Sequence, residues 1–336
     1  MTKNNKHNKH NKNDLPTVSI CTITFNRRPF IPYLIKAINN QTYPKDKIEW
    51  IIIDDGTDKI GDLVKDLPFV KYFSFNEKMT IGKKRNLSHK KSTGRIIVYM
   101  DDDDYYPPER IEHAVDKLTK SNKLIAGTSE IYLYFKELDE MWKFGPYGEN
   151  HSTAATFAFK RELLKMTSYQ EEAALAEEKH FLKNYSIPLL QLDPIKTILV
   201  FSHPQNTFDK KQLIKEETKI VKKSSLKVSN FIKDSELKDF YTNSITKTLS
   251  EYKEGDIINK PDVLKQTEEI YKKRDAMITD EQKKQKSGVV LVNPNGEKQE
   301  LSVYDTINIM KQLQERNKFL EEENNRLTEL VKSKNI

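Results

Sequence analysis

The sequence lacks several features that would assign it to a common class of protein. Cys21 is the only cysteine among 336 residues, so no disulfide can form within the chain. A reducing compartment is therefore expected, and the cytoplasm fits. No apolar run is long enough to span a bilayer, and the first residues lack the apolar core of a signal peptide. We therefore expect a soluble protein without a transmembrane segment.

Two glycine-rich phosphate-binding patterns are also missing. The first predicted strand is not followed by G-x-G-x-x-G, which excludes the usual dinucleotide fingerprint. The chain also lacks G-x-x-x-x-G-K-[ST], which excludes a P-loop. Any bound diphosphate must therefore be neutralised by a metal ion and basic side chains. Lys83, Lys84 and Arg85 lie in a suitable segment for that role.

Charge and hydrophobicity indicate a globular part joined to polar helices. Hydrophobic residues make up 36% of the chain and charged residues 32%. The formal net charge of +7 arises from 57 basic and 50 acidic residues spread along the chain. This balance permits anionic ligands but does not by itself indicate nucleic acid, and we expect no nucleic-acid partner.

The N-terminal two thirds show an alternating pattern. Residues 1–14 are basic and of low complexity, which predicts a disordered tail. The strand-like segments 17–25, 48–56, 70–75 and 95–100 then alternate with the helix-like segments 29–41, 58–67 and 82–92. This alternation predicts a right-handed parallel α/β unit.

Carboxylates follow two of the predicted strands. Asp54 and Asp55 end one strand, and Asp101 to Asp104 follow the apolar segment 96–100. The carboxyl ends of parallel strands meet at one edge of a sheet, where ligands of open α/β sheets bind. Neighbouring carboxylates in a partly buried site need a cation or a proton to offset their charge. A solvated acidic turn is the alternative, since Pro107 and Pro108 follow closely.

Four segments in this order resemble a known family. They are PTVSICTITFNR, IIIDDGTD, IGKKRN and VYMDDDDYYPPERI. Together they resemble the GT-A glycosyltransferases of the family 2 type over about residues 15–205. The resemblance implies an α/β fold of the GT-A class, with a Rossmann-like sheet that binds a nucleotide-sugar.

The resemblance also implies which residues contact the nucleotide-sugar. Thr24 and Asn26 lie where the family holds the base and ribose. Asp55 matches the aspartate that contacts the base, and Arg85 matches an arginine near the diphosphate. Asp102 lies near the expected position of the ribose.

A metal site and a general base are implied in the same way. Asp101 and Asp103 match the ends of the D-x-D motif, with Asp103 the expected ligand of Mn²⁺ or Mg²⁺ and His203 a further ligand. Glu178 corresponds to the carboxylate that removes the acceptor proton in an inverting displacement, and Glu177 is the fallback. From spacing alone, both glutamates would simply form a charged helix face.

The implied function is a metal-dependent inverting glycosyltransferase that moves a hexose from a nucleotide-sugar, with UDP the expected nucleotide. The acceptor hydroxyl belongs to a glycan, a protein or a small molecule. Two alternatives stay open: a non-catalytic nucleotide-sugar-binding scaffold built on a coiled coil, and a sugar-phosphate nucleotidyltransferase. The second normally has a glycine-rich loop after the first strand, where this chain has TFNRRPF.

The remaining chain is predicted to be less compact. After the catalytic domain at 15–209, composition predicts a helical region at 210–287, a hairpin or linker at 288–304 with Asn295-Gly296 at its turn, and a dimerising coiled coil at 305–336.

The C-terminal segment carries a heptad pattern. Leu313, Leu320 and Leu327 occupy position d, and position a is filled by Met310, Asn317, Asn324 and Val331. Leucine at d with asparagine at a favours a parallel dimer, and Arg316 at g would face Glu321 at e of the partner. A single amphipathic helix folded back on its own chain is the alternative.

Overall fold

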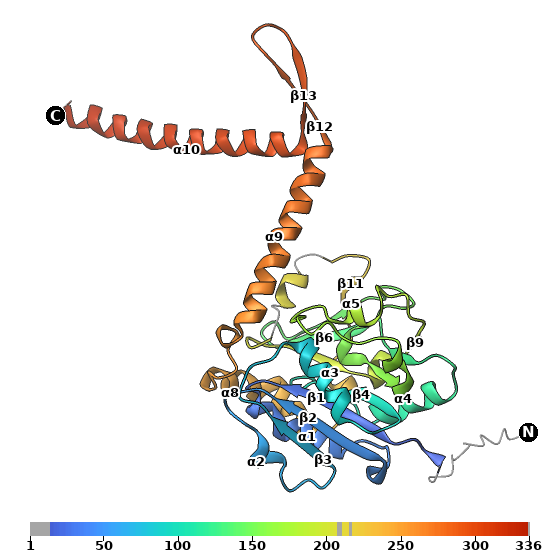
Figure 1. Ribbon diagram of the computed structural model, residues 1–336. Coiled ribbons are helices and arrows are strands. Elements are labelled where there is room, and N and C mark those ends of the chain that lie inside the picture. Colours follow the sequence, from blue (N-terminus) through green and yellow to red (C-terminus); the bar gives the residue numbers. More distant parts are fainter. Residues whose placement is uncertain (1–13, 207–209, 215–216, 335–336) are drawn as a thin grey trace, which may run out of the picture. The chain divides into compact units, whose positions relative to one another are not determined.

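The computed structural model describes residues 14–206, 210–214 and 217–334 (Figure 1). All of the predicted basic tail except its last residue, Asp14, lies outside these ranges. The chain divides into two compact units, Met1–Leu264 and Lys265–Ile336.

A mixed sheet forms the centre of the first unit (Figure 1). Among the described residues it has seven strands in the order β3-β2-β1-β4-β8-β5-β9. Strands β1 to β4 are parallel, and β8 is antiparallel to both of its neighbours, which confirms the predicted α/β class. The strands are β1 (Val18–Thr24), β2 (Ile48–Asp54), β3 (Val70–Ser74), β4 (Ile96–Tyr99), β5 (Ile125–Gly127), β8 (Ala158–Lys160) and β9 (Leu189–Gln191).

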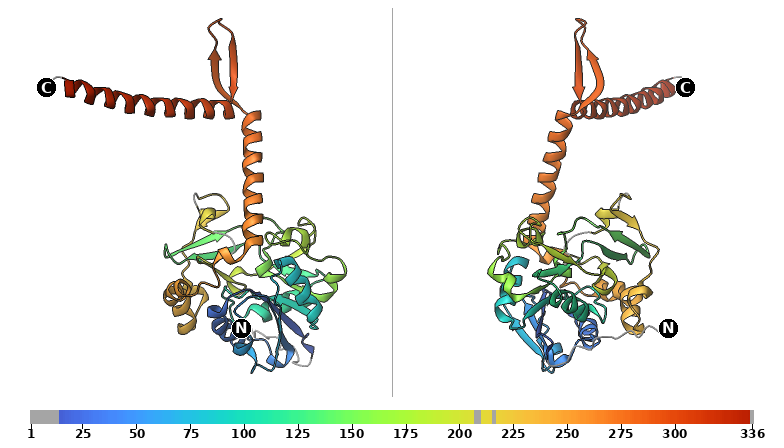
Figure 2. Two further views of the ribbon diagram at one scale, coloured as in Figure 1. Left: turned by 60° about the vertical axis from the view of Figure 1, so that its left-hand side comes forward. Right: turned by 90° about the vertical axis from the view of Figure 1, so that its right-hand side faces the viewer.

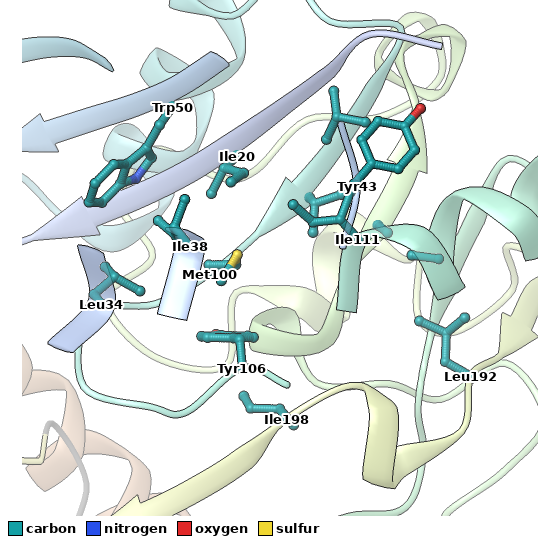
Figure 3. Close-up of a cluster of buried hydrophobic side chains, with 14 of the residues drawn as sticks. Ile20, Leu34, Ile38, Tyr43, Trp50, Met100, Tyr106, Ile111, Leu192 and Ile198 are labelled. Atoms are coloured by element: carbon teal, nitrogen blue, oxygen red, sulfur yellow. The ribbon is translucent and has the colours of Figure 1, made fainter. Parts of the chain in front are cut away.

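Alternating side chains bury both faces of this sheet, as the continuous apolar strand sequences require. In β2, Trp50 and Ile52 join a core with α1 (Ile31–Asn39) and α4 (Arg110–Thr119), which Figure 3 shows in close-up. The intervening Ile51 and Ile53 join a second core on the opposite face, against which α3 (Ile81–Lys91) packs through Leu87. With α2 (Gly61–Val64), these helices complete the alternating unit.

A smaller sheet extends the first unit. Its four strands, counted in the described part of the chain, run in the order β10-β6-β7-β11. They are β6 (Ile131–Phe135), β7 (Glu140–Phe144), β10 (Leu199–Ser202) and β11 (Val221–Lys223). Aromatic side chains such as Phe201 and Tyr241 join this sheet to a group of short helices in a third core. These helices are α6 (Val228–Phe231), α7 (Ser235–Asp239), the π-helical turn Phe240–Ser244 and α8 (Ile245–Glu251).

The second unit contains a hairpin followed by a long helix (Figure 2). The unit begins at Lys265, inside α9 (Pro261–Lys284). The hairpin strands β12 (Lys286–Val292) and β13 (Lys298–Ser302) follow α9, and α10 (Val303–Lys334) follows the hairpin. Gly296 lies in the hairpin turn with a φ of 80°, a conformation that glycine adopts without steric cost. The Val303 N–H donates to the Gln285 carbonyl at 2.8 Å and so closes the base of the hairpin.

Among the described residues, no helix combines the length and the apolar character needed to cross a bilayer.

Candidate active site

A polar cavity lies where β1, β2 and β4 end. Its volume is about 170 Å³. Among the described residues, basic and acidic side chains line it in equal number. The basic side chains are Arg27, Lys78, Lys84, Arg85 and Lys260, and the acidic ones are Asp101, Asp102, Asp103, Glu177 and Asp262. The parallel register that pairs Thr24 with Asp54, and Cys21 with Tyr99, brings these segments to one edge of the sheet, as predicted for a ligand site.

Asp101 and Glu177 share one arginine. Two Arg85 nitrogens donate to the two carboxylate oxygens of Asp101 at 2.9 and 3.2 Å, and Arg85 Nε lies 3.7 Å from Glu177 Oε1. The guanidinium also lies over the Tyr99 ring, 4.2 Å from its centroid. Burial would lower the pKa of Arg85, but the charges of Asp101 and Glu177 raise it well above its usual value, so the guanidinium stays charged.

Asp102 and Asp103 share a second arginine. Arg27 Nε is 3.7 Å from Asp102 Oδ1, and Arg27 Nη2 is 3.5 Å from Asp103 Oδ2. Asp103 also contacts His203, whose Nε2 lies 3.1 Å from Asp103 Oδ2. The next carboxylate, Asp104, points away into the fold and accepts the Phe201 N–H at 3.1 Å.

These neighbours shift the pKa values of Asp102 and Asp103 in opposite directions. Burial, followed by the charge of Asp103, raises the pKa of Asp102 to about 7. Burial also opposes ionisation of Asp103, but the hydrogen bond from His203 and the charge of Arg27 hold its pKa well below the usual range. Burial lowers the pKa of His203 to about 4, so its imidazole is neutral near pH 7. Asp103 is therefore the ionised carboxylate of the pair.

Asp103 and His203 fit the requirements of a divalent metal ion. Mg²⁺ binds oxygen ligands at about 2.0–2.1 Å, so adjacent ligands of an octahedral ion lie about 3 Å apart. The 3.1 Å contact between Asp103 Oδ2 and His203 Nε2 is a hydrogen bond in this structure, and the same two atoms would be spaced as adjacent ligands once the imidazole proton is carried by Nδ1 instead. The described residues contain no group of three or more His, Cys, Asp or Glu positioned as metal ligands. Substrate phosphate and water would have to supply the remaining ligands.

Asp101 does not join this pair in the structure, because both of its oxygens bind Arg85. Its assignment as a metal ligand stays a prediction.

The other predicted nucleotide contacts bind the protein itself. Asp55 accepts the Met79 N–H at 2.6 Å and pairs with Lys84 at 2.8 Å. Thr24 is buried, and its Oγ1 has no hydrogen-bond partner among the described residues. These two and Asn26 do not line the cavity, whereas Arg85 and Asp102 do.

Asn26 connects two loops next to the cavity. Its φ is 52°, a left-handed conformation that asparagine tolerates better than most residues. Its Oδ1 accepts the N–H groups of Thr57 at 2.7 Å and Asp58 at 3.0 Å, and its Nδ2 donates to the Glu254 carbonyl at 2.8 Å. The direct contacts of Asn26 are therefore structural.

The two candidate bases differ in position. Glu177 is 8% exposed and lines the cavity, whereas Glu178 begins the short helix α5 (Glu178–Phe181) just outside the lining. Within the described residues Glu178 has no ion pair, unlike Glu177. Burial raises the pKa of both carboxyls, and for Glu178 the charge of Glu177 adds to this and brings the pKa to about 7. The choice of Glu178 stays a prediction.

Among the cavity residues that sequence reasoning missed are two charged ones, Lys260 and Asp262. Both lie far along the chain from the family-like motifs, in a segment with no pattern beyond helix-forming residues. Only the tertiary fold brings them to the strand ends.

The structure has a mixed α/β fold with a central, largely parallel sheet. Residues 19–177, a little under half of the chain, match the family described as glycosyl transferase family 2, which confirms the predicted resemblance.

The curated relatives match only part of this chain. An uncharacterized glycosyltransferase of Rickettsia bellii is 29% identical over 130 residues, which cover 38% of this chain and 18% of the relative. The poly(ribitol-phosphate) beta-N-acetylglucosaminyltransferase TarS of Staphylococcus aureus is 26% identical over 132 residues, which cover 35% of this chain and 23% of TarS. The matches therefore span less than a quarter of either relative.

Solved structures show similarly partial likeness. The S. aureus TarS fragment 1–349 in complex with UDP-GlcNAc matches with a TM-score of 0.45 and 19% identity, covering 56% of this chain and 59% of the fragment. The mannosyltransferase PcManGT of Pyrobaculum calidifontis, in complex with GDP-Man and Mn²⁺, matches with a TM-score of 0.46 and 16% identity, covering 62% of this chain and 67% of that one.

The raised pKa of Asp102 predicts a pH-dependent stability. An unfolded aspartate ionises near pH 4, whereas folded Asp102 keeps its proton up to about pH 7. Stability is therefore lost as the pH rises between these values. Asp102→Asn should raise the free energy of unfolding relative to the wild type, and by at least about 1 kcal/mol more at pH 8 than at pH 5.

Urea unfolding of both proteins at the two pH values measures this difference. Asp66→Asn, at an exposed site, is the control and should show the same small effect at both. An equal effect of Asp102→Asn at pH 5 and pH 8 would contradict the assignment.

Proposed function

We propose that this protein is a metal-dependent, inverting glycosyltransferase that moves a hexose from a UDP-sugar to an acceptor hydroxyl. The observation that carries the proposal is the charged cavity at the carboxyl ends of β1, β2 and β4, which lies mostly within the family match. Its ionised Asp103 beside a neutral His203 suits a metal ion, and its basic side chains suit a diphosphate.

The donor diphosphate would bind among these basic side chains. Arg85 and Lys84 project from α3, and both lie within the cavity lining together with Arg27. Asp103 and His203 would hold Mn²⁺ or Mg²⁺ on the diphosphate. When bound, the ion supplies Lewis-acid stabilisation of the leaving diphosphate.

Glu178 would act as the general base. Its carboxylate accepts the proton of the acceptor hydroxyl while the hydroxyl oxygen forms a bond to the anomeric carbon. The bond from that carbon to the diphosphate oxygen breaks, and its electron pair leaves with the nucleoside diphosphate. Attack opposite to the leaving group inverts the configuration. Glu177 would position Arg85 through their 3.7 Å contact.

The sugar and the nucleotide are best tested with a panel of donors. TarS is described as transferring N-acetylglucosamine, so UDP-N-acetylglucosamine belongs in the panel with other UDP- and GDP-sugars. Release of the nucleoside diphosphate, with and without Mn²⁺ or Mg²⁺, reports turnover for any acceptor, including water. Binding without any turnover would favour a non-catalytic nucleotide-sugar-binding protein.

The metal assignment makes the first prediction for this function. Asp103→Ala should reduce metal-dependent turnover by more than about 100-fold, because one of two protein ligands is lost. The fold should survive, because the substitution relieves repulsion with Asp102. Asp66→Ala should retain full activity, and excess chelator should abolish wild-type turnover. Normal turnover by Asp103→Ala, or in chelator, would refute the metal site.

The base assignment makes a second prediction. Glu178→Gln keeps the shape of the side chain but cannot accept a proton, so transfer should fall by about 100-fold or more while donor affinity stays unchanged. Since the pKa of Glu178 is about 7, the wild-type rate should fall below that pH, and the variant should lose this dependence. Glu177→Gln is the matched control. If it, rather than Glu178→Gln, loses the pH-dependent rate, then Glu177 is the base.

We also propose that α10 forms a parallel coiled coil with a second copy of the chain. The d-position leucines Leu313, Leu320 and Leu327 are 58, 43 and 51% exposed in the single chain. Their spacing of seven residues forms a continuous apolar seam, and Asn317 and Asn324 at position a favour an aligned two-stranded coil.

The coiled coil makes a third prediction, measured by light scattering. Deleting residues 305–336 should convert a dimer into a monomer while donor turnover persists. Replacing Asn317 and Asn324 by Ile should stabilise the coil and remove the polar pairs that fix its register and oligomeric state. As a control, changing Glu315, Glu322 and Glu329 at position f to Ser should leave the dimer intact. A monomeric full-length protein would refute this interface.

A further inference from the structure

The segment 252–263, called the strap here, closes one side of the donor cavity. Asn26 Nδ2 donates to the Glu254 carbonyl at 2.8 Å, and Arg27 Nη1 donates to the Gly255 carbonyl at 3.4 Å. A Cβ atom on Gly255 would lie 2.1 Å from Gln205 Oε1, so the strap backbone packs directly against its neighbours. The strap thus reaches the cavity through a close and specific fit.

Three strap residues line the cavity: Lys260, Asp262 and Val263. Asp262 forms an ion pair with Lys78 on the opposite wall. Lys260 is 5% exposed, and its ammonium group donates to the Gln205 carbonyl at 3.3 Å. The strap therefore places a buried lysine in the donor cavity.

Lys260 differs from the other basic residues of the cavity. Arg27, Lys84 and Arg85 each lie within 4.0 Å of a carboxylate oxygen, as does Lys78. Among the described residues, no carboxylate lies within that distance of the Lys260 ammonium group. An ammonium group that is buried without a counter-ion costs several kcal/mol.

The pKa of Lys260 also indicates that its positive charge lacks a counter-ion. Burial, followed by the positive charge of Arg27, lowers the pKa of Lys260 to about 7. An anion in the cavity would offset the cost of burying this charge. Strongly perturbed pKa values of this kind cluster at functional sites.

We propose that Lys260 binds the diphosphate of the nucleotide-sugar donor and stabilises it as the leaving group. The inference rests on the proposed function and adds a donor-binding residue from outside the family match at 19–177. A diphosphate fits better than a carboxylate or a single phosphate, because it spans several cations and can share the metal ion held by Asp103 and His203.

The size of the cavity supports the same ligand group. Sites that enclose a complete small ligand have volumes of about 300–1,000 Å³, whereas this cavity measures about 170 Å³. It therefore encloses only part of a nucleotide-sugar. The charged lining matches the diphosphate better than the base or the hexose.

The test is calorimetric titration of the full-length protein with UDP, UMP and GDP in the presence of Mn²⁺. Lys260→Met keeps the length of the side chain and removes the charge, Lys260→Arg keeps the charge, and Lys265→Met is the matched control at an exposed position of α9. Lys260→Met should weaken UDP binding at least 10-fold, change UMP binding far less, and leave the melting temperature of the free protein unchanged or higher. Lys260→Arg should restore part of the UDP affinity, and Lys265→Met should resemble the wild type.

The outcomes separate this proposal from the proposed function. If the wild type binds UDP or GDP with metal but Lys260→Met binds it equally well, the role of Lys260 is refuted and the donor site stands. Tighter binding by Lys260→Met would also refute it and would identify the strap as an obstruction. If the wild type binds neither nucleotide, both proposals fall. Equal weakening of UDP and UMP with a lower melting temperature would show that Lys260 only holds the strap in place.

Discussion

Two neighbouring carboxylates, the buried Asp102 and the partly buried Asp103, are the constraint on which the rest of the site depends. The end of β4 places them together, and burial makes it costly to ionise both. Arg27 lies between them, and His203 supports the ionised state of Asp103. The remaining donors of Arg27 bind the carbonyls of Gln205, at 2.6 Å, and Gly255. The residue that balances the acidic pair thus also connects the end of β10 and the strap to the cavity.

The charged side chains of the cavity suit a ligand that carries both positive and negative charge. The first carboxylate, Asp101, is neutralised by Arg85, and Asp55 is neutralised by Lys84. A metal-bound diphosphate can exchange with such internal pairs at modest cost, because it brings both signs of charge with it. The proposed donor follows from this balance as well as from the family match.

The sequence predicted the parts of the site that depend on local pattern. Apolar segments that alternate with amphipathic ones predicted β1 to β4 and their helices, and strand polarity then placed the acidic residues after β2 and β4 at one edge. Sequence could not predict how each side chain is used. That Asp55 and Asn26 contact the nucleotide stays a prediction, and the sequence did not indicate that both also accept backbone N–H groups, of Met79 and Thr57 respectively. Lys260 could not be found at all, because its role depends on a tertiary contact between distant segments.

The central claim is that Asp103, His203 and Lys260 surround a metal-bound diphosphate. The most direct test is a crystal structure of the protein grown with Mn²⁺ and UDP, with anomalous diffraction measured to locate the manganese. Our account predicts a manganese peak bound by Asp103 Oδ2 and His203 Nε2, with the diphosphate bridging it to the Lys260 ammonium group. Manganese bound elsewhere, or UDP outside the cavity at the ends of β1, β2 and β4, would contradict it.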